Sequence, residues 1–169
     1  MMGVSGCGKS TIGREISASI PHSVFLDGDD FHQPANIDKM QRGVPLNDDD
    51  RMPWLNKICD EVIDRLLRLD SVVVACSCLK KKYRDVLRRR IKNGNALNES
   101  ISVRFVHLVL SKDVAMQRVE KREGHFMKAQ MVTSQFEALE HPDMEIEPDC
   151  VNVEATLSMH EIVEKATQK

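Results

Sequence analysis

The residues most able to do chemistry form a glycine-rich loop that begins at the third residue of this 169-residue sequence. A match to the pattern G-x-x-x-x-G-K-[ST] runs from Gly3 to Ser10, with the sequence GVSGCGKS. In such a loop the backbone N–H groups point at phosphates, Lys9 reaches the outer phosphates and the hydroxyl of Ser10 ligates Mg²⁺. The pattern predicts a nucleotide site held by Gly3, Ser5, Gly6, Cys7, Gly8, Lys9, Ser10 and Thr11.

A helix is expected directly after this loop. Ile12, Ile16 and Ile20 recur every four positions as far as Pro21, which is one apolar stripe of a helix. The N-terminus of that helix adds its dipole to the anion site. The alternative, a glycine-rich turn without a ligand, does not account for the immediate helix.

Two carboxylates follow the next apolar run, within a polar segment that spans residues 25–55. Asp27 and Asp29 lie at the carboxyl end of a predicted strand, where ligands gather in open α/β sheets. One carboxylate can serve Mg²⁺ through water, and the other can accept the proton of a phosphoryl acceptor. The alternative is a solvated acidic turn. The sequence favours neither of two interpretations of His32, which are binding of the acceptor and an ordinary position on the surface.

Further along this segment, the sequence NDDDR at residues 47–51 holds three successive like charges before Arg51. Three adjacent carboxylates repel one another, so we interpret the run as held in place by Arg51 and neighbouring backbone groups. An acidic N-cap cluster for a helix that starts near Pro53 explains Asp48 and Asp49 equally well.

Basic side chains recur in two later stretches. Arg118 and Arg122 are four residues apart on one helix face, and Gly124 can end the helix after them. Two guanidinium groups suit the charge of a transferring phosphoryl group, although an exposed, acid-paired helix is the alternative. The run KKKYRD at residues 80–85 can meet an anionic acceptor, although Lys82 and its neighbours on a helix are expected to be solvated.

Elements that can position these groups alternate along the chain. Short β-branched runs at 23–26, 71–76, 103–110 and 149–153 predict strands, and apolar stripes with helical spacing lie between them. This alternation indicates an α/β fold in which helices cover both faces of a parallel sheet. Residues 1–169 are expected to form one domain with three layers.

The strand that should feed the phosphate loop is largely missing from this chain. That strand lies centrally in P-loop folds, yet Met1 and Met2 supply at most two of the roughly five residues a strand uses. Losing three or more buried apolar side chains at about 1.5–3 kcal/mol each would remove much of a domain's stability. We therefore hypothesise that the sequence lacks an N-terminal segment.

The composition of the chain limits the classes of partner that the protein is expected to bind. The formal net charge of −2 favours neither nucleic acid nor an anionic membrane. No apolar run has the length of a membrane span or resembles a signal peptide, so a cytoplasmic protein is expected. The five cysteines are scattered without a C-x-x-C pair, which predicts reduced thiols and no cysteine metal site.

Several of these stretches together resemble the gluconokinase family of small P-loop sugar-acid kinases: MGVSGCGKS, FLDGDDFH, NIDKMQRGVPLNDDDRMPWL, CSCLKKKYRDVLR, and REGHF with SQFEALE. They extend from Met2 to about Glu140, and the block at residues 45–55 is the most distinctive. The resemblance implies phosphorylation of D-gluconate to 6-phospho-D-gluconate with ATP and Mg²⁺. It also implies a five-stranded parallel sheet and a cytosolic enzyme that is commonly a homodimer.

The resemblance also implies roles for individual residues. Asp29 is the candidate catalytic base, assisted by Lys9, Arg118 and Arg122. Within a single P-loop kinase domain, the two arginines belong to a lid segment near 118–135 that closes over ATP. Ser10 and Asp27 are the candidate metal ligands. The residues expected near the acceptor are Asp27, Asp29, His32, Arg51, Lys81, Arg84 and His125. Cys7 and Cys78 stand where the family usually has smaller residues.

Two rival functions stay open. The phosphate loop, the two carboxylates and the lid arginines also permit a kinase for another small acceptor, such as shikimate or a nucleoside monophosphate, although residues 45–55 argue against it. The other rival is an inactive nucleotide-binding chain whose first strand is missing.

Overall fold

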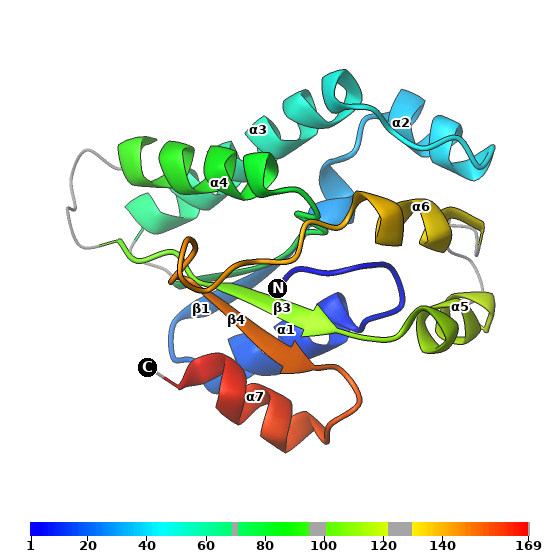
Figure 1. Ribbon diagram of the computed structural model, residues 1–169. Coiled ribbons are helices and arrows are strands. Elements are labelled where there is room, and N and C mark those ends of the chain that lie inside the picture. The colour runs from blue at the N-terminus through cyan, green and yellow to red at the C-terminus, as the bar shows by residue number, and fades with distance from the viewer. Residues whose placement is uncertain (69–70, 95–100, 122–129, 169) are drawn as a thin grey trace.

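A computed structural model describes residues 1–68, 71–94, 101–121 and 130–168. Parallel strands lie in a central layer, with helices above and below them (Figure 1). The α/β class predicted from the sequence is confirmed.

Four strands appear where β-branched runs predicted them: β1 (Ser23–Asp27), β2 (Ser71–Ala75), β3 (Phe105–Val109) and β4 (Cys150–Glu154). β1 pairs with β2 and β3 pairs with β4, both in parallel. The described residues thus form two two-stranded sheets. The expected five-stranded sheet is not what these residues form.

The N-terminal residues lie between these two pairs. The Met1 amine donates to the carbonyl oxygen of Val74 on β2 at 2.7 Å, and the Met2 N–H donates to that of Val106 on β3 at 2.8 Å. Met2 forms an isolated parallel bridge to His107 and is 1% exposed. The chain segment that feeds the phosphate loop therefore lies in the central position, between β2 and β3.

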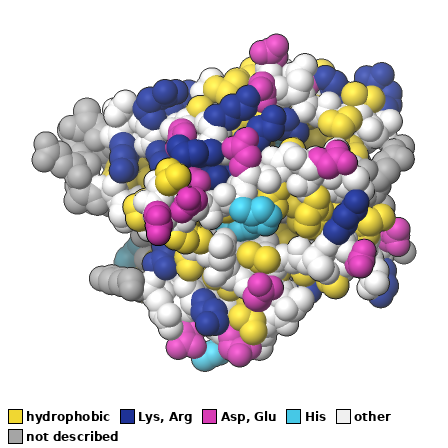
Figure 2. Space-filling view, viewed as in Figure 1, with side chains coloured by type: hydrophobic (Ala, Val, Ile, Leu, Met, Phe, Trp, Pro, Cys, Tyr) yellow, Lys and Arg dark blue, Asp and Glu magenta, His cyan; other side chains and the backbone are white. Residues whose placement is uncertain are grey.

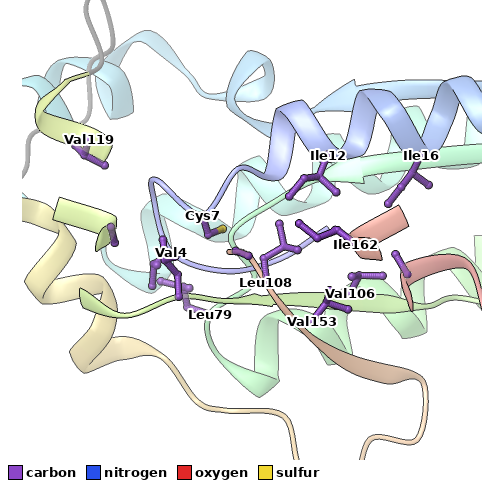
Figure 3. Close-up of a cluster of buried hydrophobic side chains, with 14 of the residues drawn as sticks. Val4, Cys7, Ile12, Ile16, Leu79, Val106, Leu108, Val119, Val153 and Ile162 are labelled. Atoms are coloured by element: carbon purple, nitrogen blue, oxygen red, sulfur yellow. The ribbon is translucent and has the colours of Figure 1, made fainter. Parts of the chain in front are cut away.

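Helices cover both faces of this layer (Figure 1). On one face lie α1 (Lys9–Ser19) and α7 (Met159–Thr167), and on the other lie α3 (Asp48–Leu67) and α4 (Lys81–Gly94). Figure 3 shows the first core, in which side chains from the loop, α1, the strands and α7 converge: Val4, Cys7, Ile12, Ile16, Leu108, Val153 and Ile162. The second core packs α3 and α4 on β2 through Trp54, Leu55, Ile58, Tyr83 and Leu87.

Shorter elements complete the described chain: the 3₁₀ helix η1 (Gly28–Phe31), α2 (Pro34–Gln41), α5 (Lys112–Glu120) and α6 (Gln130–Ala138). α3 begins at Asp48, five residues before the start predicted near Pro53. Asn47 caps it, because its side chain accepts the Asp50 N–H while the Asp50 carboxylate accepts the Asn47 N–H. Asp48, Asp49 and Asp50 therefore occupy a first turn, where acids complement the helix dipole.

Basic side chains gather over α4 with acidic side chains between them (Figure 2). Ion pairs account for this mixture, including Arg88 with Asp149 at 2.7 Å and Arg90 with Asp60 at 2.7 Å. The basic stretch is therefore largely neutralised in place. Within the described ranges, no helix has the length and apolarity to cross a membrane.

Candidate active site

A cavity of about 620 Å³ opens between the phosphate loop, the end of β1 and the starts of α3 and α4. It brings together most of the site residues predicted from the sequence: Ser5, Gly6, Gly8, Lys9, Ser10, Thr11, Asp27, Asp29, His32, Arg51 and Arg118. These residues come from segments more than 100 positions apart in the sequence. Their convergence makes this cavity the candidate active site.

The phosphate loop has the backbone geometry of an anion cradle. Gly6 has φ +84°, and a Cβ atom there would lie 2.7 Å from the carbonyl oxygen of Ala115. Gly8 has φ +93° and caps α1 without a side-chain hydrogen bond, and the first turn of α1 has no acidic residue. The N–H groups at the start of α1 thus face an anion site that no side-chain cap covers.

Two cationic side chains lie against this loop. The Lys9 ammonium donates to the carbonyl oxygens of Gly3 and Val4, both at 3.0 Å. Arg118 donates to the carbonyl oxygen of Gly6 at 3.4 Å and to that of Ala155 at 3.3 Å. Both cations donate to backbone carbonyl oxygens, and their hydrogen bonds to an anion would be stronger.

The remaining loop residues do not present side chains to the cavity. Cys7 is fully buried in the first core. A Cβ atom at Gly3 would lie 2.9 Å from the carbonyl oxygen of Leu108. Their contribution to an anion site would come from the backbone alone.

Sequence reasoning missed Gln135, which lies on α6 and lines the cavity. Its side-chain oxygen accepts the N–H of Ser5 at 2.6 Å, and its side-chain nitrogen donates to the Ser5 hydroxyl at 3.1 Å. These bonds fasten α6 to the phosphate loop across 130 positions of sequence. No local pattern in the sequence signals such a contact.

Asp27 and Asp29 lie together at the carboxyl end of β1. The Asp27 carboxylate accepts the N–H of Asp29 at 3.2 Å and lies 3.9 Å from the Arg14 guanidinium. Both aspartates line the cavity. Among the described residues no cluster of three or more His, Cys, Asp or Glu side chains could hold a metal ion. A bound Mg²⁺ would depend on one or two protein ligands together with phosphate oxygens and water.

His32 stacks on Trp54 at the wall of the cavity. The ring centroids are 4.3 Å apart and the planes differ by 12°. The Trp54 indole N–H donates to the carbonyl oxygen of Gly28 at 2.6 Å, which fixes the indole against η1. Burial lowers the pKa of His32 to about 4. His32 therefore presents a neutral imidazole to the cavity at neutral pH.

The interpretation that neighbouring backbone holds the acidic run is confirmed for Asp50, whose carboxylate accepts the Asn47 N–H. Among the described residues, no ion pair joins the run to Arg51. Its guanidinium donates to the Tyr83 hydroxyl at 3.3 Å, and that hydroxyl donates to Asp48 at 2.5 Å. Lys39 pairs with Asp50 at 2.5 Å. Asp48 pairs with Lys82 and Asp50 with Lys39, because the helix that these acids begin points them toward different elements.

Arg84 and Lys81 do not line the cavity, although both were expected near the acceptor. Arg84 is fully buried and makes a two-point ion pair with Glu147. Lys81 pairs with Asp85 at 2.7 Å within α4. The preceding residue, Lys80, lines the cavity instead. Arg122, Gly124 and His125 lie outside the described residues.

A family profile and individual known proteins both match this chain. The profile of the AAA domain family matches residues 1–141. The probable gluconokinase of Saccharomyces cerevisiae is 43% identical over 156 residues, which cover 89% of this chain and 77% of the yeast protein. The gluconokinase of Arabidopsis thaliana is 44% identical over 151 residues, covering 86% of this chain and 78% of the plant protein.

A solved structure is also similar. The crystal structure of a gluconokinase from Sinorhizobium meliloti 1021 superposes with a TM-score of 0.78 at 40% sequence identity. The superposition covers 98% of this chain and 86% of the bacterial one.

Proposed function

Because the chain belongs to the gluconokinase family of P-loop kinases, we propose that it transfers the terminal phosphoryl group of ATP to D-gluconate. The products are ADP and 6-phospho-D-gluconate. The observation that carries this proposal is that a phosphate loop, two carboxylates and an arginine from α3 line the same cavity.

The loop side of the cavity would hold the nucleotide. The N–H groups of the loop and of the start of α1 would bind phosphate oxygens, with Lys9 reaching the outer phosphates. Ser10 and Asp27 would hold Mg²⁺, which when bound neutralises charge on the phosphates. Ser5, Gly6, Gly8 and Thr11 line the same side.

The opposite side would hold the acceptor. Asp29 is the proposed base that accepts the proton of the acceptor hydroxyl as its oxygen bonds to the transferred phosphorus. The bond from that phosphorus to the bridging oxygen of ATP breaks, and ADP leaves with those electrons. The neutral imidazole of His32 is suited to hydrogen-bond an acceptor hydroxyl rather than to attract a charge.

Arg118 would stabilise the negative charge on the transferring phosphoryl group. Its position beside the carbonyl oxygen of Gly6 supports this role. A lid formed by residues 118–135, with Arg122 and His125 in it, belongs to the same proposal and rests on the resemblance alone.

A direct assay measures ADP release from ATP and Mg²⁺ with D-gluconate, with shikimate and without acceptor. We expect release only with D-gluconate, together with a product of the mass of phosphogluconate. Asp29→Asn should lower kcat by about 10²- to 10⁴-fold. Asp30→Asn is the matched control, because Asp30 is exposed and should leave the rate unchanged. Acceptor-independent release, or preference for shikimate, contradicts the proposal.

A further inference from the structure

Six cationic side chains among the described residues line the cavity: Lys9, Arg14, Arg51, Lys80, Arg118 and Lys121. Lys9 and Arg118 contact the phosphate loop, and Arg14 lies beside Asp27. Arg51 and Lys80 belong instead to the start of α3 and the residue before α4. The cavity thus has a second cationic end, away from the loop.

This second end is built around one hydrogen-bonded pair, Asp48 with Tyr83. The Tyr83 hydroxyl donates to Asp48 and accepts from Arg51. The Lys80 ammonium lies 3.8 Å from the same Asp48 carboxylate and 6.0 Å from the centre of the Tyr83 ring. Arg51 is therefore oriented by a fixed group, since Tyr83 is 3% exposed, and Lys80 lies beside the same pair.

The three successive lysines differ in what they contact. Lys82 makes a short ion pair with Asp48, and Lys81 pairs with Asp85 at 2.7 Å. The 3.8 Å separation of Lys80 from Asp48 is longer than a hydrogen bond. Of the three, Lys80 lines the cavity, and its side chain is 30% exposed. Its ammonium donors can thus reach a ligand in the cavity.

The start of α4 has no acidic residue of its own in its first turn. The Glu140 carboxylate accepts the Lys81 N–H there at 2.6 Å and so complements the helix dipole.

We propose that Lys80, together with Arg51, binds the carboxylate of the acceptor and makes the site select a sugar acid over its neutral counterpart. This inference rests on the proposed function, because it identifies the group that recognises the charged end of the proposed acceptor. A carboxylate held between a guanidinium and an ammonium would leave the hydroxyl chain of the acceptor to extend toward Asp29 and the phosphate loop.

The test compares D-gluconate with D-gluconamide, in which a neutral amide replaces the carboxylate. Lys80→Met should raise KM for D-gluconate roughly 10- to 100-fold, the worth of a hydrogen bond to a charged group, with kcat within about threefold. KM for D-gluconamide should stay within about twofold, since that acceptor has no charge to lose. Lys80→Arg should retain most of the preference for the acid.

Lys81→Met is the matched control and should leave both KM values unchanged. Equal effects of Lys80→Met on the two acceptors, or an equal effect of Lys81→Met, would overturn the inference. Calorimetric titration of each acceptor into the protein distinguishes a failure of this inference from a failure of the proposed function. Turnover of D-gluconate that does not depend on Lys80 overturns this inference alone. Binding that depends on Lys80 without any turnover overturns the proposed function alone.

Discussion

The Arg84 guanidinium and the Glu147 carboxylate meet at two points inside the protein, with Nε to Oε2 at 2.8 Å and Nη2 to Oε1 at 2.6 Å. Their side chains are 0% and 3% exposed. Arg84 also donates to the carbonyl oxygen of Cys78 at 3.1 Å. The pair therefore ties α4 and the segment after β2 to the chain that leads into β4.

Removing one charge of this pair should destabilise the fold. Glu147→Gln leaves the Arg84 charge buried without its counterion and also removes the 2.7 Å ion pair of Arg88 with Glu147. The free energy of unfolding should fall by about 3–5 kcal/mol. Urea denaturation measures the change. The double variant Arg84→Met with Glu147→Leu should lose less than the single one, because neither charge then stays buried alone. A loss below about 1 kcal/mol in Glu147→Gln would contradict this account.

Acid should weaken the same contact. Hydrogen bonds from Arg84 lower the pKa of Glu147 from 4.5 to about 2. A carboxyl whose pKa is lower in the folded state stabilises the protein above its unfolded value and loses that contribution as pH falls from about 4.5 toward 2. The free energy of unfolding should therefore drop between pH 6 and pH 3, less steeply in Glu147→Gln. Equal slopes for the two proteins would refute the assignment.

His32 should not titrate near neutrality. Its burial beside Trp54 lowers its pKa to about 4, so the ring stays neutral from pH 6 to 8. Proton NMR of the imidazole resonances, with His32→Asn used for assignment, measures this directly. We expect a midpoint near 4 and no inflection from His32 in kcat/KM near pH 6.5. A midpoint close to 6.5 would mean that the ring is solvated.

Alanine substitutions should separate two glycines of the phosphate loop. Positive φ costs about 1–3 kcal/mol for a residue with a Cβ atom, which affects both Gly6→Ala and Gly8→Ala. At Gly6 the new Cβ also meets the Ala115 carbonyl oxygen at 2.7 Å, whereas at Gly8 its nearest neighbour is the Ile12 side chain at 3.3 Å. Thermal unfolding should rank Gly6→Ala as clearly less stable. Equal melting temperatures would count against the close approach of α5 to the loop.

Apolar residues added before Met1 should raise stability. A cavity of about 310 Å³ lies beside Met1, lined in part by Val72, Val74, Val103 and Phe105. Burial also lowers the pKa of the Met1 amine, an unfavourable position for a charge that a peptide bond would remove. Five added valine and isoleucine residues should gain on the order of 2–5 kcal/mol in denaturation experiments. A glycine-serine extension of equal length is the control, and an equal gain from it would refute the explanation.

Local patterns were sufficient for much of the fold. The four strands and the helix after the phosphate loop were predictable because alternation and helical spacing act over a few residues. The start of α3 was missed because Pro53 suggested a boundary, whereas the capping pair of Asn47 and Asp50 begins the helix earlier. Pro53 is the sixth residue of α3, where a proline removes one backbone hydrogen bond of the helix.

Sequence alone determined the phosphate loop, because glycine conformation, the lysine and the following helix are all local properties. Only the tertiary structure decided which of Lys80, Lys81 and Lys82 faces the cavity. Lys80 precedes the first residue of α4, whereas Lys81 and Lys82 lie in its first turn, where successive residues differ by about 100° in direction. The buried pair of Arg84 with Glu147, 63 positions apart, is a long-range contact that anchors this helix.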